Sequence, residues 1–75
     1  MGTIDDLTTT ASVKAALLAD PKIGARHINV HTKDGVVHLS GYVHTAEERE
    51  LAEEVARIYG GDPVVENELE IRPAV

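Results

Sequence analysis

Apolar positions in the first third of the chain recur at helical spacing. They form a stripe made of Thr9, Val13, Ala16 and Leu17. This spacing predicts a helix from about Leu7 to Ala19 with one buried face. Asp5 or Asp6 stands just before the stripe and is a suitable N-cap. Asp20-Pro21 predicts the end of the helix, because the residue before a proline is pushed out of the α region.

The spacing then changes to strict alternation, which predicts two strands paired as a hairpin. Residues 27–33 form the first strand and residues 36–43 the second. The positions expected to face inward are Ile28, Val30, Thr32, Val37, Leu39 and Val43. Asp34-Gly35 joins the strands and is typical of a two-residue type I′ turn, in which both central residues have positive φ. Gly41 falls on the inward face opposite Ile28, where a missing side chain permits close approach of backbone or helix.

Helical spacing returns at residues 46–59, and the signals at both ends of this segment are clear. Thr45 and Glu48 have the spacing of a capping box, in which each side chain accepts the other residue's backbone amide. The apolar arc of this helix is predicted to be Leu51, Ala52, Val55, Ile58 and Tyr59. Gly60-Gly61 follows, and glycine is favoured in the left-handed conformation that ends helices.

The last periodic segment, residues 64–71, alternates again and predicts a third strand. One face holds Val65, Asn67, Leu69 and Ile71, and the other holds Glu66, Glu68 and Glu70. The chain is therefore predicted to be an α+β two-layer α-β-β-α-β sandwich, with two helices on one face of a three-stranded sheet. We favour parallel pairing of strands two and three through a right-handed crossover, which makes the sheet mixed. Antiparallel pairing with strand one is the alternative.

The element order and the motif DGVVHLSGYV, residues 34–43, resemble the BON domain, a small bacterial module of osmotic-shock, secretion-linked and envelope-associated proteins. The resemblance extends over residues 12–23, 27–43, 48–61 and 64–71, and it includes Asn67. One departure is the corner Gly60–Pro63, where the family has a short Gly-Val turn. The resemblance implies a single non-catalytic interaction module over residues 1–75, with its core at about 5–72. It also implies binding to phospholipid or membrane surfaces, or an accessory role to partner domains, with no catalytic residues.

Composition and charge narrow the classes of partner. The 75 residues carry a net charge of −6 and contain no cysteine, which excludes disulfides and thiolate metal sites. The Lys and Arg residues are scattered, whereas a nucleic-acid backbone or an anionic membrane attracts clustered cations. No apolar run approaches the roughly 20 residues of a membrane span. The N-terminus lacks a signal-peptide pattern, so a cytoplasmic location is expected as the chain is written. A periplasmic or envelope location is expected if the chain is a fragment.

The candidate chemistry is sparse, and we expect no cofactor and no enzymatic activity. With a two-residue turn, His31 faces His38 on the polar side of the hairpin, and a glutamate of the last strand could complete a metal site. No compact ligand motif accompanies this pair, so two solvated histidines are the expected state. The three glutamates of the last strand are interpreted as a solvated edge that deters aggregation. An acidic patch for a basic partner or cation is the alternative.

A second apolar line on the first helix is the candidate partner surface. Leu7, Ala11 and Leu18 lie away from the main stripe, and part of this line is expected to pack against the other helix. Otherwise it forms an exposed strip for a protein, a second copy of the chain or a lipid surface. The expected function is docking on a protein partner or a phospholipid surface, and the charge favours protein. The alternative is a structural or self-association module that uses the sheet edges or the first helix.

Overall fold

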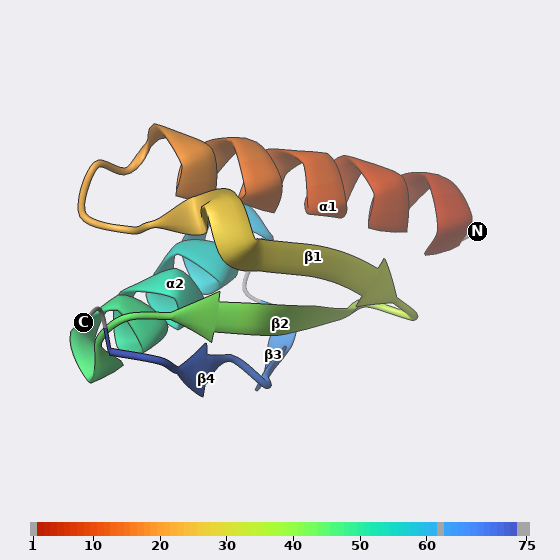
Figure 1. Ribbon diagram of the computed structural model, residues 1–75. Coiled ribbons are helices and arrows are strands. Elements are labelled where there is room, and N and C mark those ends of the chain that lie inside the picture. Colours follow the sequence, from red (N-terminus) through yellow and green to blue (C-terminus); the bar gives the residue numbers. More distant parts are fainter. Residues whose placement is uncertain (1, 62, 74–75) are drawn as a thin grey trace.

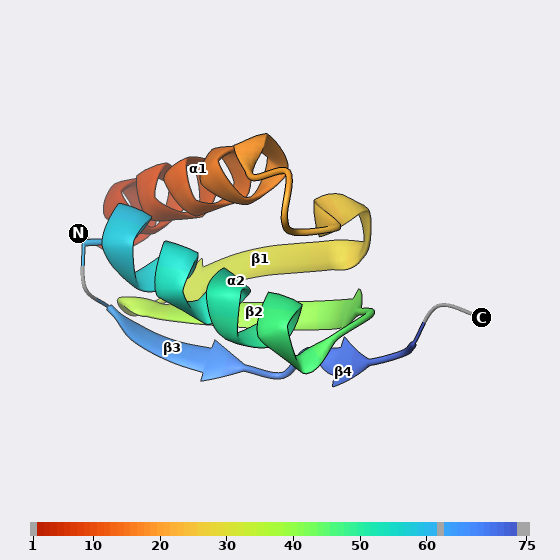
Figure 2. The ribbon, with the colours of Figure 1, turned by 90° about the vertical axis from the view of Figure 1, so that its left-hand side faces the viewer.

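The computed structural model describes residues 2–61 and 63–73 and has the predicted two layers (Figure 1). The helices are α1 (Gly2–Ala19) and α2 (Ala46–Tyr59). The strands are β1 (Ile28–Lys33), β2 (Val36–Val43), β3 (Val64–Asn67) and β4 (Glu70–Ile71), and a 3₁₀ turn, Ala25–His27, precedes β1. Figure 2 shows α1 beside β1 and α2 crossing in front of β2 and β3. The fold is α+β with an open mixed sheet.

β2 is the central strand, and its pairings decide between the two predicted topologies. It pairs antiparallel with β1 and parallel with β3 and β4. The favoured parallel pairing of the second and third predicted strands is therefore confirmed. The prediction of one continuous third strand is wrong, because the regular pairing with β2 is interrupted at Glu68 and Leu69, although the Glu68 amide still donates to the Leu39 carbonyl oxygen at 2.8 Å. The register is the same on both sides of this break, since Val64 pairs with Val36 and Glu70 with Tyr42.

The glycines of the hairpin lie where the sequence predicts special backbone geometry. Asp34 and Gly35 have φ of 52° and 78°, as a type I′ turn requires. Gly41 has φ of 104°, and a Cβ built on it would overlap the carbonyl oxygen of His27. The close approach predicted at Gly41 is thus an approach of backbone to backbone.

The core lies between the helices and the inward face of the sheet. Its buried members are Val13, Leu17, Ile23, Ile28, Val37, Leu39, Val43, Ala52, Val55, Ala56 and Leu69. Ala56 was not in the predicted arc of α2, whereas Ile58 and Tyr59 were, and they are 64% and 58% exposed. The prediction that Ile58 and Tyr59 face the core is wrong, because both residues lie in the last turn of α2, where the helix is open to solvent. Ile71, predicted to face inward, is 44% exposed at the end of an edge strand that only β2 flanks.

The helix ends agree with the sequence prediction for α2 but not for the start of α1. α1 begins at Gly2, so Asp5 and Asp6 lie within the helix and the predicted cap is wrong. No proline stands between Gly2 and Leu7 to stop the helix from starting earlier, and acidic residues are favourable near a helix N-terminus. In the capping box, the Glu48 amide donates to Thr45 Oγ1 at 3.1 Å and the Thr45 amide donates to Glu48 Oε1 at 3.0 Å. Gly61 has the left-handed conformation after α2, with φ of 79°. Asp62, in the corner that departs from the family pattern, lies outside the described residues.

Candidate partner-binding surface

A groove that opens to solvent lies between α1 and α2, and we call it the helix groove. Its apolar lining consists of Ala15, Ala16, Ala19, Pro21, Val55 and Tyr59. Ser12 and Asp20 add polar atoms to the lining. α1 contributes only small side chains, because its larger apolar residues, Val13 and Leu17, point into the core. The groove therefore has one wall of methyl groups and one wall of larger side chains.

Large apolar side chains stand exposed on both helices. Leu18 on α1 is 60% exposed and Ile58 on α2 is 64% exposed, and neither lines the groove. Tyr59, which does line the groove, is 58% exposed. A surface with several large apolar groups in one place is typical of an interaction site.

The predicted partner residues lie on the solvent side of α1. Leu7, Ala11 and Leu18 are all exposed. The expectation that part of this line packs against α2 is wrong. α2 contacts the other flank of α1, where Ala16 packs against the core and Val55 shares the groove lining. The alternative interpretation, an exposed strip, describes these residues as they stand.

An acidic stripe runs along the exposed side of α2. It consists of Glu47, Glu50 and Glu54, which are spaced three and four residues apart and are all exposed. Among the residues that the structure describes, the salt bridges are Arg57–Glu53 and Arg72–Glu70, so none involves the acidic stripe. Glu50 and Glu54 line a separate pocket with Arg49, Arg57 and Asn67, so this charge lies away from the helix groove.

The outer face of the sheet holds the predicted histidine pair. His31 pairs directly with His38, and their ring centroids are 6.0 Å apart. Glu66 lies opposite His38 on the other side of β2. Within residues 2–61 and 63–73, no three His, Asp or Glu side chains come together in a way that could hold a metal ion. The pair therefore has at most two protein ligands to offer, and its solvated state stays a prediction.

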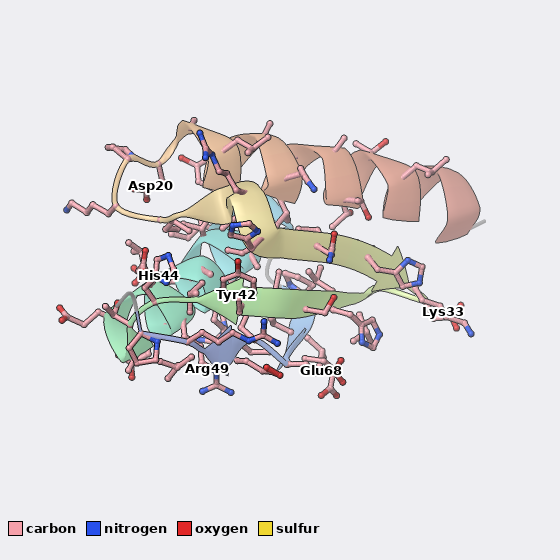
Figure 3. The ribbon with its side chains drawn as sticks, viewed as in Figure 1. Asp20, Lys33, Tyr42, His44, Arg49 and Glu68 are labelled. Carbon is pink, nitrogen blue, oxygen red and sulfur yellow. The ribbon has the colours of Figure 1, made fainter. Side chains whose placement is uncertain are left out.

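A stack of three side chains crosses the same face nearer its other end. The rings of His27 and Tyr42 are 4.4 Å apart and nearly parallel, and the Arg72 guanidinium lies 4.7 Å from the Tyr42 centroid. His27 lies on the β1 side of β2 and Arg72 follows β4 on the other side, so they flank the ring from opposite sides. His44 approaches the Tyr42 ring edge-on and its Nδ1 lies 2.8 Å from the Arg72 carbonyl oxygen (Figure 3). The hairpin register that pairs His31 with His38 also brings His27 near Tyr42, but the hairpin sequence gives no sign of Arg72 or His44.

Asn67 and Arg49 hold α2 against the broken third strand. The Arg49 guanidinium donates to the carbonyl oxygens of Leu69 and Asn67, at 3.0 and 3.1 Å. The Asn67 amide nitrogen donates to the Arg49 carbonyl at 3.0 Å, and its Oδ1 accepts from the Leu69 amide. These bonds satisfy backbone groups where β3 leaves the sheet. The sequence did not predict this role of Arg49, labelled in Figure 3, because a charged residue on a helix is usually expected to face solvent.

Glu48 connects the capping box to the loop after α1. Its carboxylate accepts from the amides of His44, Thr45 and Gly24, at 2.9, 3.0 and 3.2 Å. Desolvation alone would raise the pKa of Glu48, but the backbone donors of His44, Gly24 and Thr45 together outweigh it and lower the pKa below its ordinary value. The ionised carboxylate therefore joins the loop after α1 to the start of α2.

Comparison with known families decides the kind of domain this is. The pattern of the BON domain matches residues 5–73. The chain belongs to the BON domain family. This BON chain is also 41% identical over 71 residues to osmotically-inducible protein Y of Escherichia coli strain K12. The match covers 95% of the chain but 35% of that relative, so the chain spans about a third of the relative's length.

Family membership sets the coarse function of the BON chain. It is a bacterial, stress-related module of the BON type, with a relative named for its induction by osmotic conditions. In the described part of the chain, neither helix is long and apolar enough to cross a bilayer. In the part of the chain that the structure describes, the BON fold has an apolar groove between the helices and a largely polar sheet face on which Val64 is also exposed.

Proposed function

We propose that the chain is a non-catalytic interaction module that docks on a protein partner through the helix groove. The observation that carries this proposal is the open apolar groove between the helices, with the half-exposed Tyr59 in its lining. Burying such groups contributes about 25 cal/mol for each Å² of apolar surface removed from water. A partner that covers them gains binding energy without any change in the fold.

An anionic membrane is the weaker candidate for this surface. The chain has a net charge of −6, and the acidic stripe of α2 is exposed. Anionic lipid headgroups repel such a surface, since membrane-surface helices carry Lys and Arg on their polar faces. α1 also lacks the Trp, Tyr and Phe side chains that anchor helices in the interface.

Two measurements on the intact chain test this proposal. A photo-crosslinking residue placed at Ile58 is expected to give a discrete adduct with a protein in bacterial cells, and the same residue at Glu66 on the sheet serves as the control. Vesicles of phosphatidylglycerol and cardiolipin are expected to leave the chain in the supernatant at physiological salt. Robust co-sedimentation that is lost in Leu18→Glu would establish a lipid surface instead.

Self-association is distinguished in the same experiments. An Ile58 adduct with twice the mass of the chain, together with a dimer by light scattering, would assign the groove to a second copy. We expect a monomer at micromolar concentration, because two copies that each carry a net charge of −6 repel each other.

A further inference from the structure

We infer that Arg49 closes the edge of the sheet formed by β3 and β4, so that no strand of another polypeptide can pair there. This inference goes beyond the proposed function and does not depend on it. A sheet edge presents backbone amides and carbonyls that can pair with an extended peptide or with a second copy of the chain, and natural proteins close such edges. The two edges of this sheet are closed in different ways.

The β1 edge is covered by a helix. In both Figure 1 and Figure 2, α1 lies on the side of β1 that is turned away from β2. Thr10 Oγ1 donates to Thr32 Oγ1 at 2.7 Å, and Lys14 Nζ donates to the Ile28 carbonyl oxygen at 3.4 Å. α1 therefore occupies the place where an added strand would lie.

The opposite edge consists of β3 and β4, which lie at the rim of the sheet away from α1 (Figure 1). The Glu68 amide donates to the Leu39 carbonyl oxygen of β2 at 2.8 Å. Successive backbone groups along a strand point in opposite directions. The amides and carbonyls of Val65, Asn67 and Leu69 therefore point away from β2, to the side on which another strand would pair.

Arg49 reaches from α2 to two of these outward carbonyls. Its Nε donates to the Leu69 carbonyl oxygen at 3.0 Å, and its Nη2 donates to the Asn67 carbonyl oxygen at 3.1 Å. The Asn67 side chain in turn accepts from the outward Leu69 amide at 3.2 Å. An added strand needs these same backbone groups, and it would have to displace charge-assisted bonds, which are stronger than those between neutral groups.

The position of the Arg49 guanidinium is fixed by its neighbours. Arg49 is half-buried, and Asn67 Nδ2 donates to the Arg49 carbonyl oxygen at 3.0 Å and to Glu53 Oε1 at 3.2 Å. Glu53 also pairs with Arg57. Because α2 and β3 hold Arg49 between them, its donors face the sheet edge.

The outer face determines which strand would add if this edge opened. Glu66, Glu68 and Glu70 are all exposed along the edge. Opposite charges on neighbouring strands stabilise a sheet, whereas like charges destabilise it. A second copy that paired through the same edge would bring three more glutamates, so an extended chain with lysines at alternate positions is the suitable probe.

A synthetic peptide of alternating lysine and valine, blocked at both ends, tests the inference on the intact chain. Arg49→Ala is expected to bind the peptide at least about tenfold more tightly than the wild type, because two freed carbonyls can accept bonds from it. Backbone amide NMR should show the shifts at Val65, Asn67 and Leu69. Arg57→Ala is the matched control, since it removes the same charge from α2 but has its described bond to Glu53.

The control separates an open edge from a simple change in charge. Arg57→Ala is expected to bind the peptide no more tightly than the wild type. Equal gains in Arg49→Ala and Arg57→Ala, equal affinity of the wild type and Arg49→Ala, or shifts confined to the helices would overturn the inference.

A second substitution keeps the test decisive if Arg49→Ala does not fold. Arg49→Lys keeps the charge but replaces the forked guanidinium with a single ammonium group, which cannot bond both carbonyls in the same way. Its affinity for the peptide is expected to lie above that of the wild type. A folded Arg49→Lys with the affinity of the wild type would contradict the role of the guanidinium. These results are independent of crosslinking at Ile58, which tests the helix groove.

Discussion

The helix groove and the outer face of the sheet are both open to solvent, but their side chains are used differently. On the sheet, His27, Tyr42 and Arg72 stack on one another, and Arg72 also pairs with Glu70 at 3.0 Å. The groove is lined mainly by apolar side chains, and Tyr59 in its lining is 58% exposed. The sheet face pairs many of its polar groups with one another, whereas the groove leaves apolar surface open to solvent.

This difference shows why exposure alone does not identify a binding surface. Polar side chains on a wet sheet face gain little from a partner, since they exchange one set of hydrogen bonds for another. Apolar side chains gain whenever a partner removes them from water. The two surfaces therefore differ because of the side chains that they carry. The core between the helices and the sheet keeps the two surfaces apart.

The largest effect should come from Gly41→Ala, which disturbs the sheet shared by both surfaces. The added Cβ would overlap the His27 carbonyl oxygen, and φ at this position is 104°. We expect a loss of unfolding free energy of about 3 kcal/mol or more, measured by urea denaturation. Gly35→Ala is the matched control, because Gly35 also has positive φ but has nothing within 4 Å of a built Cβ. It should lose only about 1 kcal/mol, and equal losses would contradict the clash at Gly41.

Asn67→Ala should have the next largest effect and should act on the contact between β3 and α2. It removes the bonds that join β3 to α2 through the Arg49 carbonyl and the Leu69 amide. We expect a loss of about 2 kcal/mol, since partly buried backbone groups lose their partners, together with amide shifts at Val55 and Tyr59. Glu66→Ala, on the exposed side of the same strand, is the control. Amide shifts confined to the sheet in Asn67→Ala would show that α2 does not depend on this contact.

Acidification should destabilise the contact that Glu48 makes between the loop after α1 and the start of α2. The folded-state pKa of Glu48 is lowered from its ordinary value of 4.5, so the unfolded chain binds this proton more readily. The stabilisation is complete above the unfolded pKa and is lost as pH falls through the folded pKa. Glu48→Gln should therefore be less stable than the wild type at pH 6, and the difference should shrink below about pH 4.5. Denaturation at a series of pH values, with Glu47→Gln as control, measures this. A difference that is constant with pH would contradict the role of the charge.

The smallest effect on stability should come from Ile58→Glu, although its effect on binding should be large. Ile58 is 64% exposed, so we expect a change of less than about 0.5 kcal/mol in unfolding free energy. Crosslinking to a protein partner through a photo-reactive residue at Tyr59 should be lost or strongly weakened, because a charge replaces an apolar side chain on α2. Ser40→Glu on the sheet face is the control and should leave binding unchanged. A large loss of stability in Ile58→Glu would mean that this side chain belongs to the core.

Most of the fold was accessible from sequence because the strongest signals are local. The turn at Asp34-Gly35 and the capping box of Thr45 and Glu48 depend on residues a few positions apart, and both form as predicted. The break in the third strand was not accessible. It depends on Asn67 bonding to α2, which residues 64–71 do not reveal on their own.

The groove was only partly predictable for a related reason. The apolar line of Leu7, Ala11 and Leu18 was visible in the spacing, but its exposure depends on which flank of α1 meets α2. Ile58 and Tyr59 fit the helical arc of α2, yet the arc extends past the point where the two helices stay in contact. Periodicity identifies apolar sides of a helix, and tertiary packing determines which of them is covered.

The connectivity of the sheet also sets an order of events in folding. β1 and β2 meet across a two-residue turn, while β3 must pair with β2 across the whole of α2. Contacts between residues close in sequence close smaller loops and form faster. We therefore expect the hairpin to nucleate early and the C-terminal strands to dock late. Since Asn67 and Arg49 join α2 to those strands, the groove is complete only at the last step, and a partner would engage finished molecules in preference to nascent ones.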